Sequence, residues 1–253
     1  MTLRVILWHY LWITPHILLV GVLAAMWRRK LVGQFPVFFV YLVEEVVQFL
    51  FLYPMSQMSS ISGPTFLKFD AAFLAISTGL RFGVIHEVFA YTFRNYPSLG
   101  HFGKPVFRWG TAVLLMFGLF AALFVGGNDP QRVLAILWVL SRTASFLQCG
   151  LLSILFVFST YLGLSLRNQV FGIALGLGIF ACVDLAAAAI RAGFGTESTT
   201  SLDYYTMGVY HCCVLVWLAY LWLPERVPQF AVKAVPEHDL ESWNKELQRL
   251  IQQ

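Results

Sequence analysis

Seven stretches of predominantly apolar residues, each close in length to a membrane-spanning helix, account for most of the chain. A helix needs roughly 20 such residues to cross the hydrocarbon core of a bilayer. The stretches are residues 5–27, 36–56, 68–93, 108–126, 132–163, 169–192 and 204–223. Helices and closed barrels are the structures that satisfy the backbone inside lipid, and segments of this length favour helices. The sequence therefore predicts an all-α, polytopic membrane protein with a bundle of seven transmembrane helices.

The composition supports this prediction and excludes several classes of protein. Hydrophobic residues make up 58% of the chain and charged residues 12%, whereas soluble domains carry about 25% charged residues. The net charge of +4 is small and scattered along the sequence, so no nucleic-acid partner is expected. These values also exclude a disordered chain and an ordinary water-soluble enzyme. The lipid bilayer is the expected surrounding of most of the protein.

Lysine and arginine are concentrated at the ends that follow the first, third, fifth and seventh stretches. The clearest example is Arg28, Arg29 and Lys30, directly after the first stretch. Because cytoplasmic loops carry an excess of these residues, the sequence predicts an outside N-terminus and a cytoplasmic C-terminus in the plasma (inner) membrane. Residues 1–224 then form the bundle, and residues 225–253 form a cytoplasmic tail.

The end of the tail, residues 237–253, is predicted to form a short amphipathic helix. Leu240, Trp243, Leu247 and Leu250 fall on one face at helical spacing. Such a face can lie on the inner membrane surface or against the bundle, or it can bind a protein partner. We assign these four residues as candidate partner-binding residues. For the protein as a whole, we expect a separate protein partner or a homo-oligomer.

Charged residues inside the hydrocarbon are the most informative feature for function, because burying them is costly and they usually face the bundle interior with a partner. Glu44 and Glu45 lie on the second stretch, and Arg81 and Glu87 lie on the third. Estimated at 1.5 Å per residue, these groups fall between the inner boundary and the midplane. The arrangement predicts an internal ion-pair set of these four residues, in which Arg81 pairs with Glu45 or Glu44.

A second polar level is predicted in the outer half of the bundle. Arg142 and Asp184 lie about 15 and 12 Å from the outer boundary, and His211 lies at about 10 Å. Ser145 and Gln148 extend the polar stripe of Arg142 along the same stretch. We expect an Arg142–Asp184 pair and a ligand cavity lined by these five residues, between the third, fifth, sixth and seventh spans. Two other interpretations stay open: the polar groups only fix helix packing, or they form a proton or redox pathway.

Motifs for catalysis or cofactor binding were sought and not found in the sequence. The lysines lie at span ends or in the tail, so a retinal Schiff base within a span is not expected. There is no zinc-binding histidine–glutamate spacing, glycine-rich phosphate loop or hydrolase constellation. We therefore predict no catalytic residue, no metal and no cofactor.

The sequence favours a non-enzymatic, seven-span membrane receptor or accessory subunit. It would hold or sense a small ligand or lipid and couple, as signalling proteins do, to a separate protein. The alternatives are a proton-coupled transporter and a structural subunit of a membrane assembly.

Overall fold

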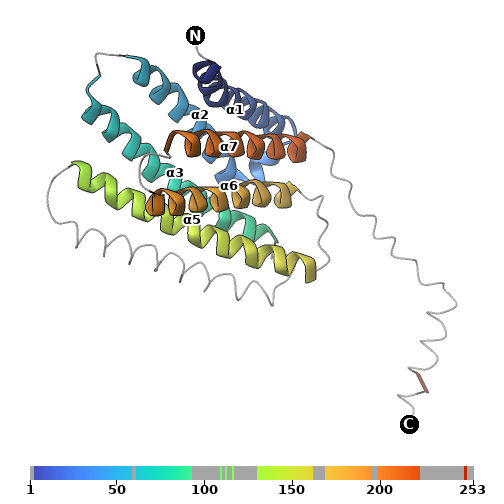
Figure 1. The fold of residues 1–253 in the computed structure, drawn as a ribbon. Helices are drawn as coiled ribbons and strands as arrows, with labels where there is room; N and C mark the ends of the chain where they lie inside the picture. Colours follow the sequence, from blue (N-terminus) through green and yellow to red (C-terminus); the bar gives the residue numbers. More distant parts are fainter. Residues whose placement is uncertain are drawn as a thin grey trace.

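The computed structural model describes residues 3–58, 61–92, 130–161, 169–194 and 199–222, together with residues 109, 112, 116, 248 and 249. This part of the chain contains α-helices and one short 3-10 helix, and no strand (Figure 1). The elements are α1 (Leu3–Arg28), η1 (Leu31–Gly33), α2 (Pro36–Gln57), α3 (Gly63–Thr92), α5 (Pro130–Tyr161), α6 (Gln169–Phe194) and α7 (Thr199–Trp222).

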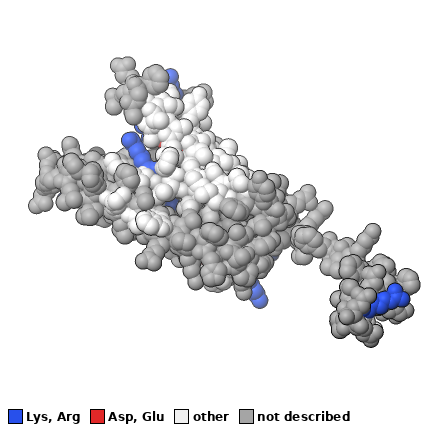
Figure 2. All heavy atoms as spheres, turned by 90° about the horizontal axis from the view of Figure 1, so that it is seen from below, with Lys and Arg blue, Asp and Glu red and all other residues white. Residues whose placement is uncertain are grey.

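Five helices, α1, α2, α3, α6 and α7, are long and apolar enough to cross a membrane. In α5, the apolar part described with its side chains is shorter and covers Ser141–Val157. Figure 2 shows one face of the molecule, on which the described surface is largely uncharged. Large apolar side chains are exposed along the helices, and examples are Ile17, Leu50 and Phe146. These features support an integral membrane protein.

The observed helices correspond to six of the predicted stretches. The predicted span at 108–126 lies outside the described residues, apart from residues 109, 112 and 116. The main differences are at the starts of α3 and α7, which both begin before the predicted residue.

The earlier start of α3 follows from local chemistry that the prediction treated as a chain break. The backbone N–H groups of Thr65 and Phe66 donate to the Ser62 carbonyl oxygen at 3.0 and 3.1 Å. The Ser62 and Thr65 hydroxyls are hydrogen-bonded at 2.8 Å. Pro64 lies in the first turn, where its missing N–H costs nothing. The Ser-Gly-Pro sequence therefore begins the helix, and Asp70 lies inside α3 rather than at the end of a span.

The six described α-helices form a closed ring of neighbours, in the order α1, α2, α3, α5, α6, α7 and back to α1, and α3 also contacts α6 across the ring. Figure 1 shows α5, α6 and α7 lying side by side. The largest fully buried side chains lie on several of these helices and include Trp217, Tyr41 and Phe38. The rings of Phe38 and Tyr41 lie 5.4 and 6.3 Å from that of Trp217. The core is thus formed by side chains from helices that are far apart in the sequence.

Contacts along the helices define their directions. The rings of Trp8 and Tyr204, near the starts of α1 and α7, are 5.5 Å apart. The Arg29 guanidinium, just after α1, donates to the Trp222 carbonyl oxygen at 2.6 Å. These two helices are therefore parallel.

Four other pairs of neighbouring helices are antiparallel, as paired contacts near opposite helix ends indicate. These contacts are His9–Tyr53 and His16–Phe49 for α1 and α2, Phe38–Glu87 and Phe51–Phe73 for α2 and α3, Ser145–Asp184 and Phe156–Phe171 for α5 and α6, and Ile173–Trp217 and Phe180–Tyr210 for α6 and α7. Consequently α1, α3, α5 and α7 run in one direction and α2 and α6 in the other.

Two glycines allow α6 and α7 to approach closely. A Cβ atom at Gly172 would overlap the Tyr220 side chain, and one at Gly176 would overlap the Trp217 indole. The Trp217 Nε1–H donates to the Ile173 carbonyl oxygen at 3.3 Å, so the indole lies directly against the α6 backbone. Small residues commonly permit this kind of helix packing inside membranes.

We predict that Gly176→Ala lowers the midpoint of thermal unfolding of the protein in detergent. The added methyl group overpacks the α6–α7 contact, at a cost of about 1–3 kcal/mol. The control is Gly150→Ala on α5, where an added Cβ meets no described atom within 4 Å. Alanine is also the better helix former by about 0.5–1 kcal/mol, so this variant should not be less stable. Equal losses in both variants would contradict the close packing of α6 and α7.

Candidate functional site

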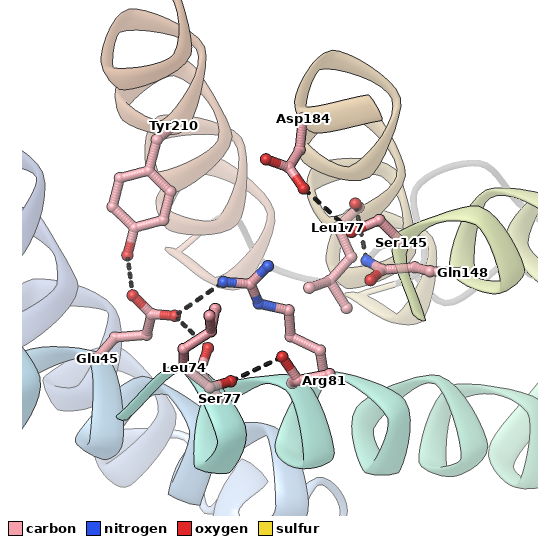
Figure 3. Close-up of polar contacts among 10 residues, drawn as sticks. Glu45, Leu74, Ser77, Arg81, Ser145, Gln148, Leu177, Asp184 and Tyr210 are labelled. Atoms are coloured by element: carbon pink, nitrogen blue, oxygen red, sulfur yellow. Dashed lines mark hydrogen bonds and ion pairs between the residues drawn. The ribbon is translucent and has the colours of Figure 1, made fainter. Parts of the chain in front are cut away.

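An ion pair between α2 and α3 lies at the centre of the polar interior. The Arg81 Nη2 and Glu45 Oε1 atoms are 3.9 Å apart, and the side chains are only 17% and 10% exposed. The same carboxylate accepts hydrogen bonds from the Ser77 hydroxyl at 3.3 Å and from the Tyr210 hydroxyl at 3.1 Å. Figure 3 shows Glu45 held between these groups. Because each partner offsets part of the cost of burying the charge, the carboxylate is fixed relative to α3 and α7.

The Arg81 guanidinium extends from this pair toward α6. It lies 5.1 Å from the centroid of the Phe180 ring, an arrangement that stabilises a cation. Asp184 on α6 is close enough to contribute electrostatic attraction, and Figure 3 shows the guanidinium between Glu45 and Asp184. The Arg81 Nε atom is buried without a hydrogen-bond partner among the described residues. The guanidinium therefore lies between carboxylates on α2 and α6 and forms its ion pair with the one on α2.

The predicted Arg142–Asp184 pair is not formed. Among the described residues, ion pairs occur at Arg81–Glu45 and Arg191–Asp203, while Asp184 accepts a hydrogen bond from the Ser145 hydroxyl at 3.1 Å. The register of α5 and α6 explains the difference, because Ser145 lies one turn after Arg142 and is level with Asp184. Depths counted from loop boundaries could not resolve a shift of one turn.

Gln148 belongs to the same α5–α6 contact. Its amide nitrogen donates to the Leu177 carbonyl oxygen at 2.9 Å, and the side chain is buried. Ser145 and Gln148 also face α3, where they line a cleft with Arg81 that has no room for a water molecule. The structure thus gives both residues a packing role between helices.

Glu87 and Glu44, two members of the predicted ion-pair set, are not paired with Arg81. The Glu87 carboxylate accepts the backbone N–H groups of Val37 and Phe38, each at 2.9 Å. These donors lie in the first turn of α2, where a helix leaves its N–H groups unpaired, so Glu87 caps α2 from α3. Both carboxylate oxygens of Glu44 are buried without a hydrogen-bond partner among the described residues.

His211 also lies apart from its predicted neighbours. Its ring is 5.9 Å from that of Tyr10 on α1, and its Nδ1 atom is buried without a hydrogen-bond partner in the described part of the chain. The preceding residue, Tyr210, reaches Glu45 in the interior instead. Adjacent residues on a helix point about 100° apart, which separates these two side chains.

The cavity formed by the structure lies beside the central ion pair, in the half of the bundle that contains the starts of α1 and α7. It has a volume of about 340 Å³ and is partly open. Side chains from α1, α2, α3, α6 and α7 line it. The polar ones are His16, Glu45, Gln48, Asp70, Thr206 and Tyr210, and the apolar ones are Leu11, Trp12, Phe49, Leu52, Phe66, Phe180 and Met207.

An aromatic cluster between α1 and α2 holds one wall of this cavity. The His16 ring is stacked on Phe49 at 4.2 Å, and the Phe49 ring lies 5.2 Å from that of Tyr53. The Trp12 ring lies 5.3 Å from Tyr53, nearly perpendicular to it. His16 Nδ1 is 2.6 Å from the Trp12 carbonyl oxygen, and because a carbonyl only accepts, Nδ1 is the donor. This bond fixes the tautomer of neutral His16 and leaves Nε2 as an acceptor.

None of the five predicted cavity residues lines this cavity, which lies on the α1–α2 side of the interior. Sequence reasoning named Glu45 but did not identify Asp70, Tyr210, Trp12 or Phe180 as site residues. For Asp70, the Ser62 and Pro64 helix-start signal would have placed the carboxylate within a span. The aromatic residues carry no comparable signal, because aromatic side chains are common throughout the sequence.

The predicted partner-binding residues Leu240, Trp243, Leu247 and Leu250 lie outside the described residues. Within the described part of the chain, no group of three or more His, Cys, Asp or Glu residues is placed to hold a metal ion. Comparisons with protein-family models, curated proteins and solved structures found no match. The cavity and the central ion pair are therefore the features of the described residues that bear on function.

We predict that Arg81→Met destabilises the protein by about 3–5 kcal/mol, because it leaves the Glu45 charge buried without its counter-ion. The double variant Arg81→Met/Glu45→Gln should be more stable than the single variant, since glutamine needs no counter-ion. Its amide oxygen can accept from one of the Ser77 and Tyr210 hydroxyls, and its amide nitrogen can donate to the other. Unfolding in detergent, followed by circular dichroism, measures both.

The matched control is Arg191→Met, at the more exposed pair with Asp203. There the side chains are 24% and 41% exposed although the atoms are only 2.7 Å apart, so the loss should stay below about 1 kcal/mol. If the double variant is no more stable than Arg81→Met, the two buried charges do not depend on each other.

Proposed function

We propose that the chain is a non-enzymatic, seven-span membrane receptor or accessory subunit that holds a small ligand or lipid and couples to a separate partner. The observation that carries the proposal is the cavity of about 340 Å³ beside the Arg81–Glu45 pair. Small-molecule sites are typically apolar cavities of about 300–1,000 Å³ with a few placed polar groups. The mixture of aromatic walls with Glu45, Gln48 and Asp70 fits that description.

The seventh span of this proposal is the predicted stretch at 108–126. Its support comes from helix direction: α3 and α5 run the same way, so the chain must return from the end of α3 to the opposite end of the bundle before α5 begins. That stretch is long and apolar enough for such a return.

The proposed orientation has the N-terminus outside and the C-terminus in the cytoplasm, in the plasma (inner) membrane. The excess of Lys and Arg after alternate stretches supports it. In this orientation the cavity occupies the outer half of the bundle, because it lies near the starts of α1 and α7. A ligand from the outside or from the outer leaflet would then have the shorter path to it.

A ligand in this cavity would contact five helices at once. A ligand can shift the equilibrium between two arrangements of a protein only by the difference in its binding free energy to the two. Here Glu45 and Tyr210 both line the cavity and are hydrogen-bonded across α2 and α7. A ligand that binds Glu45 or Tyr210 would change the contact between α2 and α7. These helices would transmit that change to the far end of the bundle.

Ligand binding predicts that a molecule co-purifies with the protein and is lost when the cavity is filled. Thr206→Phe adds a ring at a position that lines the cavity. Thr143→Phe is the matched control, because both threonines donate to the carbonyl four residues earlier and Thr143 does not line the cavity. Native mass spectrometry should detect the bound mass in the wild type and in Thr143→Phe only. Its absence from all three proteins would contradict the ligand-binding proposal.

Coupling to a partner predicts that the tail is needed for a specific interaction. Replacing Leu240, Trp243, Leu247 and Leu250 with serine removes the apolar face of the predicted helix. Replacing Glu241, Lys245 and Gln248 with serine alters the opposite, polar face and serves as the control. Cross-linking in membranes followed by mass spectrometry should lose the same partner, or the same homo-oligomer, only in the first variant. An unchanged cross-linking pattern would contradict this role of the tail.

Glu44 favours a second candidate function, proton-coupled transport. Both of its carboxylate oxygens are buried and without a hydrogen-bond partner among the described residues, and charged groups in this setting commonly belong to proton relays. Transport predicts proton uptake into proteoliposomes that Glu44→Gln abolishes and Asp203→Asn, at a more exposed ion pair, leaves intact. No uptake by the wild type under an imposed gradient would contradict this candidate.

A further inference from the structure

The charges on the walls of the cavity indicate which sign of charge its ligand carries. Glu45 and Asp70 both line it, while no lysine or arginine is among the lining residues, all of which are described. Among the lining residues, His16 is the one with a titratable nitrogen. The walls therefore offer negative charge to a ligand, and an anionic ligand would meet two carboxylates inside a low-dielectric bundle.

The aromatic side chains of the lining also favour a positively charged ligand. Trp12, Phe49, Phe66, Phe180 and Tyr210 contribute to the walls, and the faces of such rings attract ammonium and guanidinium groups. The Phe180 ring already attracts a cation within the protein, because the Arg81 guanidinium lies 5.1 Å from its centroid. Arg81 itself does not line the cavity, so it leaves the other rings free for a ligand.

The two carboxylates differ in how far they are already neutralised. Glu45 has Arg81, Ser77 and Tyr210 as partners. Asp70 has no hydrogen bond or ion pair in the described part of the chain. Seven residues separate Asp70 from Ser77 on α3, which corresponds to about 10 Å along the helix. The uncompensated charge is thus at one end of the cavity, and the neutralised Glu45 is at the other.

We propose that this cavity binds a small organic cation, with an alkylammonium group at Asp70 and an apolar body against Trp12 and Phe49. This inference rests on the proposed ligand-binding function and specifies its ligand class. The apolar surface of the walls favours a hydrophobic body, and the volume of about 340 Å³ is at the small end of ligand sites. A free amine and the headgroup of an aminolipid share the required chemistry.

The test uses a pair of probes that differ in one group. Protonated phenethylamine carries an ammonium where 2-phenylethanol carries a hydroxyl, and the two have the same aromatic body. Isothermal titration calorimetry on the full chain in maltoside micelles should give at least tenfold tighter binding of the amine. Asp70→Asn should remove most of that preference, and Trp12→Leu should weaken binding of both probes.

Asp203→Asn is the matched control for charge, because it removes the same charge from a residue that does not line the cavity. It should keep the preference for the amine. Thermal unfolding of each variant checks that the bundle is folded, and Asp70, which has no partner among the described residues, should tolerate the change to asparagine.

The outcomes separate this inference from the function on which it rests. Equal affinity for the two probes, or a preference that survives in Asp70→Asn, overturns the cation site while a ligand site of another class still stands. Failure of both probes to bind, together with no co-purified ligand in the wild type, overturns both. Competition by phosphatidylethanolamine, but not by phosphatidylglycerol, in nanodiscs would assign the site to a lipid headgroup. Amine binding that neither lipid affects would assign it to a free cation.

Discussion

A buried guanidinium is stable only where the protein replaces the water it has lost, and in this bundle Arg81 obtains that replacement from groups on α2 and α6. Glu45 on α2 provides the counter-ion, while Phe180 and Asp184 on α6 provide further attraction. Tyr210 on α7 then holds the other oxygen of Glu45. Removing Arg81 or Glu45 leaves the other charge uncompensated. The interaction therefore joins α2 to α3 through the ion pair and extends to α6 and α7 through Phe180 and Tyr210.

The cavity borders that arrangement and shares Glu45, Phe180 and Tyr210 with it. Glu45 and Tyr210 form its polar end and are already engaged with each other, so they present a defined surface. The stacked rings of His16 and Phe49 give it a rigid wall between α1 and α2. Asp70 lies on α3 and has no hydrogen-bond or ion-pair partner among the described residues. The fixed polar end, the rigid aromatic wall and this carboxylate together support the proposed ligand site.

The sequence predicted the helices well because bilayer thickness sets their length and because charged residues interrupt apolar runs. It also predicted that Arg81 and Glu45 could pair, since intramembrane charges are few and need partners. It could not resolve rotation and register between helices, and this is why Asp184 is bound to Ser145 rather than to Arg142. The capping role of Glu87 depends on where α2 begins relative to α3, which no local pattern encodes.

An experimental density map of the full chain in lipid nanodiscs tests the central claim most directly. We expect Arg81 within ion-pair distance of Glu45, together with non-protein density in the cavity between Trp12, Phe49 and Asp70. A map in which the bundle's own side chains fill that space, and Arg81 is paired with a different carboxylate, would contradict it.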